Sequence, residues 1–226
     1  MQKNYKILGI DLGGCMSGNS AYIYATVSDG KIKLHDAFKE PKHKEHLACH
    51  NFLLDACNRY RVDAIAIDAP LSLPLPLYIP DHLSLPREGS GEIINPYLYR
   101  HTDYYLYKSF GLRPMPPAGD RIGRLTARAI ALLQACDYHF PNITLNGQRL
   151  PIYEVYPKQI AQQLHLGKYK TDPSQLFEQL GIERIDHDEH LLDAMLCVYG
   201  GYRILTGHTT MPPENVKSEG WCFPVL

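Results

Sequence analysis

Two short apolar runs of this sequence each end in an aspartate. The first, 5–11 (YKILGID), ends at Asp11, and the second, 62–68 (VDAIAID), ends at Asp68. Ligands of open α/β sheets bind beyond the carboxyl ends of the strands, so parallel neighbouring strands would bring both carboxylates to one sheet edge. Two adjacent carboxylates repel unless a cation lies between them, and Mg²⁺ and Mn²⁺ prefer oxygen ligands. The sequence therefore predicts a divalent-metal site at this edge.

Three further candidates for the same site occur later in the chain. Glu154 lies within a predicted strand at 152–156, and His190 precedes Asp193 by about one turn of the last predicted helix. A lone aspartate at a strand end is more often a cap or turn former than a ligand. The combination of two strand-end aspartates with a helical His-x-x-Asp is what favours a metal site.

The hydrophobic pattern predicts the elements that must position these residues. Strands are expected at 5–11, 20–28, 31–38, 62–68 and 152–156. Helices are expected at 43–60, 120–138, 158–165, 173–180 and 188–206. The Asp29-Gly30 pair indicates a hairpin between the second and third strands. An antiparallel meander followed by alternating strands and helices predicts one α/β domain over 1–226, with a mixed five-stranded sheet flanked by helices.

A long insertion is expected after the fourth strand, at 69–118. It holds nine of the 17 prolines and six of the 16 tyrosines, and neither a helical nor a strand period is sustained. Irregular segments of this length are often lids or binding loops. The insertion is thus a candidate specificity element, and the alternative is an ordered segment without a role in binding.

Arginines and tyrosines alternate in and beside this insertion. Arginine forks grip phosphates, and aromatic rings stack on unpaired bases. The candidate substrate-binding residues are Arg100, Arg113, Arg121, Arg124 and Tyr104. In the alternative interpretation, the tyrosines pack the insertion and the arginines keep it soluble.

Composition limits the classes of function. The net charge of −1 gives no overall basic footprint of a nucleic-acid binder, although a local patch remains open. None of the six cysteines forms a Cys-x-x-Cys pair, which disfavours a zinc ribbon or a thioredoxin motif. No apolar run reaches the roughly 18 residues of a membrane span, and no signal peptide is expected. The simplest expectation is a cytoplasmic protein with reduced thiols, in an oligomeric state that the sequence leaves open.

Several segments resemble known families. His190-Leu191-Leu192-Asp193-Ala194 is similar to the H/D-x-x-D-A segment on the last helix of Holliday-junction resolvases of the RNase H-like superfamily. More closely, six segments spread over residues 9–224 resemble a family of predicted RNase H-like nucleases, domain-of-unknown-function family 429. They are GIDLGG (9–14), IDAPLSLP (67–74), RHTD (100–103), YEVYPKQI (153–160), LLDAMLC (191–197) and EGWCFP (219–224).

This resemblance implies a fold and a mechanism. It implies an RNase H-like sheet and two-metal hydrolysis of DNA or RNA phosphodiesters with Mg²⁺ or Mn²⁺. Asp11 would bridge both ions, Asp68 would hold one and Asp193 the other. Glu154 or His190 would be an additional ligand or a proton carrier. RNase H itself also has a glutamate at the start of its first helix, for which Glu45 is the nearest candidate here.

Other interpretations stay open. The chain could be a nucleic-acid or nucleotide binding module of the same fold without turnover, or a small-molecule phosphotransferase or phosphohydrolase. The segment 9–14 is also similar to the first phosphate loop of sugar kinases and actin-like ATPases, but those enzymes use two such domains. His43, His46 and His50 could form a zinc site on one helix face, although a solvated face is the simpler interpretation.

Overall fold

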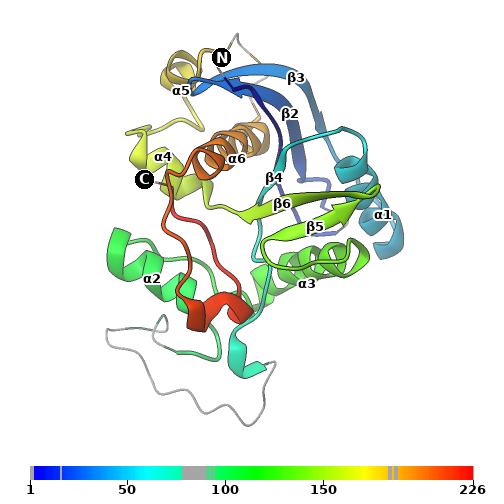
Figure 1. Ribbon diagram of the computed structural model, residues 1–226, viewed down its shortest axis with the longest axis vertical. Helices are drawn as coiled ribbons and strands as arrows, with labels where there is room; N and C mark the ends of the chain where they lie inside the picture. Colours follow the sequence, from blue (N-terminus) through cyan, green and yellow to red (C-terminus); the bar gives the residue numbers. More distant parts are fainter. Residues whose placement is uncertain are drawn as a thin grey trace.

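Six strands form one mixed sheet in the order β3-β2-β1-β4-β6-β5 (Figure 1). The computed structural model describes residues 3–15, 17–77, 91, 93, 95–182, 185 and 188–225. The three central strands β1, β4 and β6 run parallel, whereas β2, β3 and β5 are antiparallel to their neighbours. The strands span Tyr5–Asp11 (β1), Ala21–Ser28 (β2), Lys31–Lys39 (β3), Ala64–Asp68 (β4), Asn142–Leu145 (β5) and Gln148–Glu154 (β6).

Helices cover both faces of this sheet, as the sequence predicts. On one face α6 packs against β1, β2 and β4, with α4 beside it, and on the other face lie α1 and α3 (Figure 1). The helices span His46–Asn58 (α1), His101–Phe110 (α2), Asp120–Ala135 (α3), Pro157–Gln163 (α4), Ser174–Leu180 (α5) and Glu189–Leu205 (α6). In the described residues, no helix is both long and apolar enough to cross a membrane.

Side chains of the central strands alternate between two hydrophobic cores. On β4, Ile65 and Ile67 enter the core under α1 and α3, whereas Ala64 and Ala66 face α6. Alternation with a period of two follows from the pleat of a strand. Since the α6 side of β4 carries only small residues, the helix can come close to the sheet.

Gly9 permits the closest approach between α6 and the sheet. A Cβ atom on Gly9 would lie 2.2 Å from the carbonyl oxygen of Ala194, a distance that atoms cannot adopt. Two helical turns further on, a Cβ on Gly201 would lie 3.0 Å from the Cβ of Ala66. Glycine at these two positions therefore lets the last helix pack closely against β1 and β4. Gly9 lies two residues before Asp11, where β1 ends.

Two of the sequence predictions need correction. The sheet has six strands rather than five, because the short strand β5 forms a hairpin with β6 through Asn146 and Gly147. The segment 69–118 is not irregular throughout, because it contains α2 and the short 3₁₀ helix Leu75–Leu77. Helix α2 ends where Gly111 takes a left-handed conformation with φ 67°. Residues 78–90, which include Arg87, lie outside the described residues.

The C-terminal segment packs onto the end of β6. After the 3₁₀ helix Glu214–Glu219, the Phe223 amide donates to the carbonyl of Glu154 at 2.9 Å, and Cys222 bridges to Glu154 in parallel. Trp221 is buried beside Tyr105 of α2. This segment therefore ties α2 to the sheet (Figure 1).

Candidate active site

Asp11 and Asp68 lie side by side at the carboxyl ends of β1 and β4. They are register partners on these parallel strands, as the sequence predicts. Desolvation and the negative charges of Asp11, Asp193 and Glu154 raise the pKa of Asp68 well above its ordinary value. In the described part of the chain, no hydrogen-bond donor contacts the Asp68 carboxylate. The site therefore holds an acid that an added cation would stabilise.

Helix α6 carries His190 to Asp11. The Asp188 side chain caps the helix by accepting from the His190 amide at 3.0 Å and the Leu191 amide at 3.3 Å. Two residues into the helix, the His190 ring donates from Nδ1 to Asp11 Oδ2 at 2.7 Å. This hydrogen bond raises the pKa of His190. Burial raises the pKa of Asp11, and the same hydrogen bond lowers it by less. The pair can thus hold a proton next to the acids.

Asp193, one turn further along α6, is held by two residues that the sequence analysis missed. The Tyr169 hydroxyl donates to Asp193 Oδ1 at 2.6 Å, and the Lys170 ammonium donates to Oδ2. Burial is the largest single effect on Lys170 and lowers its pKa, but the hydrogen bond to Asp193 and the charges of Asp193, Glu189 and Asp11 together raise the pKa of the ammonium. Both residues lie in the segment between α4 and α5, where no periodic pattern or motif distinguishes them.

Glu154 lies on the opposite face of the sheet from Asp68, although both residues line the same cavity. It is in register with Ile67 rather than Asp68, and neighbouring positions on a strand face opposite sides of the sheet. Both of its oxygens are occupied: Oε1 accepts from Arg100 at 2.6 Å, and Oε2 accepts from Arg100 at 2.7 Å and from the Leu71 amide at 2.8 Å. The prediction that Glu154 ligates the metal is not supported by this geometry, which makes Glu154 a brace for the loop after β4.

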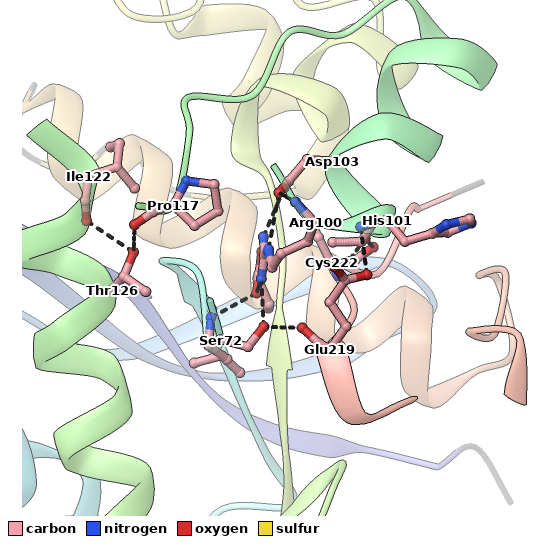
Figure 2. A network of polar contacts seen from close by, with 12 residues as sticks. Ser72, Arg100, His101, Asp103, Pro117, Ile122, Thr126, Glu219 and Cys222 are labelled. Carbon is pink, nitrogen blue, oxygen red and sulfur yellow. Dashed lines mark hydrogen bonds and ion pairs between the residues drawn. The ribbon is translucent and has the colours of Figure 1, made fainter. Parts of the chain in front are cut away.

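Arg100 is likewise engaged within the protein. The residue is 1% exposed, and it also donates to both oxygens of Asp103, at 3.1 Å and 2.9 Å. Figure 2 shows this network, in which Ser72 and Glu219 link the loop after β4 to the N-terminus of α2. The guanidinium lines the cavity at Asp11 and Asp68, but its nitrogens already donate to Glu154, Asp103 and Ser72, so these contacts do not favour the predicted role of Arg100 in substrate binding.

A second buried arginine braces the loop after β1 in the same way. Arg128 of α3 donates to the carbonyl of Gly13 at 3.0 Å and to Ser20 Oγ at 2.9 Å. Its other nitrogen donates to both oxygens of Glu40, at 2.7 Å and 2.8 Å. The loops that follow Asp11 and Asp68 are therefore each held by one buried arginine–glutamate pair.

The other predicted substrate-binding residues lie on the surface near α2 and α3. Arg113, Arg121 and Arg124 are exposed, and Arg113 lies 5.9 Å from the centroid of the Tyr107 ring. Tyr104 is partly buried, with the Lys108 ammonium 5.8 Å from its ring centroid. The three arginines are therefore open to an anionic partner, whereas Tyr104 offers only part of its ring.

Two other sequence candidates lie apart from the acids. Glu45 is the exposed N-cap residue of α1 and does not line either of the cavities described next. His43 precedes α1, which begins at His46, and packs its ring against Phe52 with centroids 5.5 Å apart. Helix α1 thus begins three residues later than the expected helix over 43–60, so His43, His46 and His50 do not share one helical face.

Two cavities meet at Asp68. One, of about 350 Å³, is lined by Asp11, Asp68 and His190, by Arg100 with its partners Asp103 and Glu154, and by apolar residues. The other, of about 680 Å³, is lined by Asp68, Asp193 and Lys170. The acids predicted from the sequence are thus reachable from two sides, and Asp68 belongs to both.

The described residues do not contain a preassembled metal cage. Across ranges 3–15, 17–77, 95–182 and 188–225, no group of three or more His, Cys, Asp or Glu side chains is arranged to hold a metal ion. The Lys170 ammonium contacts the Asp193 carboxylate, and the His190 ring contacts the Asp11 carboxylate. The carboxylates still suit Mg²⁺, which often uses one or two protein carboxylates and takes its other ligands from water and phosphate.

Comparisons with known proteins leave the family open. No family model matches this chain, and no curated protein matches it. Among solved structures, T. thermophilus RuvC in complex with Holliday junction substrate is 15% identical with a TM-score of 0.46, covering 90% of this chain and 96% of that chain. A second Thermus thermophilus RuvC structure is 12% identical with a TM-score of 0.43, covering 89% and 96%. The function must therefore be inferred from the chain's own residues.

Proposed function

We propose that this chain is a Mg²⁺- or Mn²⁺-dependent nuclease that hydrolyses phosphodiester bonds of DNA or RNA. The observation that carries the proposal is the in-register pair of Asp11 and Asp68, with Asp193 brought to the same sheet edge by α6. The resemblance of the segment 190–194 to Holliday-junction resolvases, and of the whole chain to family 429, points to the same chemistry. The order of an antiparallel meander followed by parallel strands agrees with an RNase H-like fold.

The chemistry of the donor set fits a divalent ion. Asp68 is strongly desolvated and faces other carboxylates, and hard oxygen donors are what Mg²⁺ and Mn²⁺ prefer. We assign Asp11, Asp68 and Asp193 as the residues that would hold the metal. Such ions, when bound, activate a water molecule and stabilise the leaving oxygen. Glu154 is left out of this ligand set because Arg100 and Leu71 occupy its oxygens.

Other residues of the site would manage protons and charge. His190 keeps a proton on Nδ1 through Asp11, and its raised pKa suits a donor to a departing oxygen. Tyr169 orients Asp193 by a hydrogen bond of 2.6 Å. Lys170 neutralises Asp193 before substrate and metal arrive, and its ammonium can then turn to a phosphate oxygen.

The test is metal-dependent cleavage by the full chain. Single-stranded DNA, duplex DNA, RNA, an RNA–DNA hybrid and a four-way junction are each incubated with Mn²⁺ or Mg²⁺, and products are resolved on denaturing gels. We expect cleavage that EDTA abolishes and that Asp11→Asn and Asp193→Asn each reduce by at least about 100-fold. Asp55→Asn, an exposed change on α1, is the matched control and should retain full activity. Absence of cleavage on every substrate would overturn the proposal.

One observation favours a second candidate, a binding module of the same fold without turnover. Two of the three acids already have partners within the protein, because the His190 ring donates to Asp11 and the Lys170 ammonium pairs with Asp193. A module of this kind would bind nucleic acid without metal-dependent cleavage. Binding that survives both Asp11→Asn and Asp193→Asn, with no cleavage by the unaltered protein, identifies this candidate.

A further inference from the structure

The 350 Å³ cavity combines the acids with a large apolar wall. This wall comes from four parts of the chain: the loop after β1, helix α2, the segment between α2 and α3, and helix α3 itself. The residues concerned are Leu12, Leu106, Pro114, Met115, Ile122 and Leu125. Hydrolysis of a phosphodiester by carboxylates requires none of these apolar groups, so the wall is available to another part of the ligand.

The wall is built into the fold rather than left to a loose loop. The Thr126 hydroxyl on α3 donates to the carbonyl of Pro117 at 2.9 Å, which fastens the segment carrying Pro114 and Met115 to α3 (Figure 2). The Gly119 amide donates to the carbonyl of Pro116 at 2.9 Å and closes the same segment into a turn. The cavity therefore has a defined shape before a ligand enters.

Positive charge lies next to the apolar wall along the chain. Three exposed arginines each directly precede a residue of the apolar wall in the sequence, namely Arg113, Arg121 and Arg124. Guanidinium groups bind phosphate oxygens through paired hydrogen bonds. The cavity thus has an apolar wall next to carboxylates, and three exposed arginines adjoin that wall in the sequence.

We propose that this cavity takes one unpaired nucleobase, from a nucleotide whose phosphodiester lies at Asp11 and Asp68. A base has flat apolar faces that suit the wall, and 350 Å³ falls within the usual size of small-ligand sites. A paired base cannot enter, because it must first leave the helical stack. The inference rests on the proposed nuclease function and narrows it to single-stranded, bulged or mismatched nucleic acid.

Binding measured without turnover tests the cavity. The full chain is titrated in Ca²⁺ with a short duplex that carries one bulged 2-aminopurine, and with the same duplex fully paired. We expect the bulged duplex to bind at least about 10-fold more tightly and its fluorescence to change on binding, which is the scale of one base contact. Equal affinities with no fluorescence change would overturn the inference.

Cavity-filling variants supply the matched comparison. Leu125→Trp fills the interior, and Met115→Trp narrows the opening from an exposed position that is 53% accessible and so does not threaten folding. Each should reduce binding of the bulged duplex about 10-fold, to the level of the paired one. Gln134→Trp, exposed at the other end of α3, should bind as the unaltered protein does. Normal binding of the bulged duplex by both Leu125→Trp and Met115→Trp would overturn the proposal.

The outcomes separate this inference from the nuclease proposal. If Mn²⁺-dependent cleavage occurs but Leu125→Trp and Met115→Trp cleave the bulged duplex at the normal rate, the cavity inference is wrong and the nuclease proposal stands. If nothing is cleaved, but bulge-selective binding is present and is lost in these variants, the nuclease proposal fails and the cavity assignment stands.

Discussion

Arg100 grips both carboxylate oxygens of Glu154, with Nη2 2.6 Å from Oε1 and Nη1 2.7 Å from Oε2. Both side chains are buried, and Glu154 also accepts from the Leu71 amide, three residues after Asp68. The pair therefore positions the loop that follows the second acid of the site. Burial keeps water away from the two charges, so each depends on the other for compensation.

Removing one member of this pair should cost stability rather than metal affinity. Arg100→Met leaves Glu154 and Asp103 as uncompensated buried charges, and we expect a loss of about 3–5 kcal/mol in the free energy of unfolding, measured by urea titration. Glu154→Gln should cost less, about 1–3 kcal/mol, because the amide keeps some hydrogen bonds. Arg113→Met, at an exposed site, is the control.

Calorimetric titration with Mn²⁺ separates the two roles of Glu154. If Glu154 only positions the loop, folded Glu154→Gln should bind Mn²⁺ with an affinity within about threefold of that of the unaltered protein. This is a difference of under about 1 kcal/mol in binding free energy. A large loss of Mn²⁺ affinity with an unchanged unfolding midpoint would instead make Glu154 a ligand.

Gly9→Ala should damage both the fold and the site. The new methyl group would lie 2.2 Å from the backbone oxygen of Ala194, so α6 must move away from β1. We expect about 1–3 kcal/mol of destabilisation from overpacking, together with loss of cleavage because His190 and Asp193 move with the helix. Gly14→Ala is the matched control, because nothing lies within 4 Å of its added methyl group, and it should keep normal stability. Equal unfolding curves for the two variants would contradict the close packing of α6.

Much of this architecture follows from the sequence because its signals are local. The apolar runs that end at Asp11 and Asp68 are strands buried on both faces, and the acids fall at the sheet edge without any need for long-range information. The strand β5 was missed although Asn146-Gly147, a strong hairpin signal, was present. The helix α2 was obscured by the prolines and tyrosines of its surroundings.

The sequence does not predict the register between strands or the contacts between residues far apart in the chain. Glu154 ends a strand as Asp68 does, but a one-residue offset in pairing turns its side chain to the opposite face. Its partner Arg100 is 54 residues away in the chain. Lys170 reaches Asp193 from a segment without periodicity. Such pairings depend on how the elements dock, which no local pattern encodes.

Lys170→Gln should strengthen metal binding. The ammonium competes with a cation for Asp193, so its removal frees a carboxylate oxygen. We expect Mn²⁺ affinity to rise roughly 3- to 10-fold in calorimetric titration, about 0.7–1.4 kcal/mol. Stability without metal should fall by less than about 1 kcal/mol, because the Lys170 side chain is 43% exposed and solvent screens the pair. Lys168→Gln, exposed nearby, is the control, and a drop in Mn²⁺ affinity for Lys170→Gln alone would show that the lysine assists rather than competes.

Asp188→Ala should weaken the N-terminus of α6 in a pH-dependent way. The carboxylate caps the helix and contacts Lys39 at 2.6 Å, so we expect a loss of about 0.5–2 kcal/mol near pH 7 in urea unfolding. Burial acts in the opposite direction, but the bonds to Lys39 and to the helix amides lower the pKa of Asp188 below its ordinary 3.8.

A lowered pKa in the folded state fixes the sign of this pH dependence. The stabilisation from the Asp188 charge is fully present above the unfolded value of 3.8 and is lost as the pH falls through the lower folded value. The stability gap between the unaltered protein and Asp188→Ala should therefore shrink on acidification below about pH 4. Asp188→Asn keeps a capping oxygen without the charge, so its own gap should be smaller near pH 7. A gap for Asp188→Ala that stays constant between pH 7 and pH 3 would show that the carboxylate charge contributes nothing to the cap.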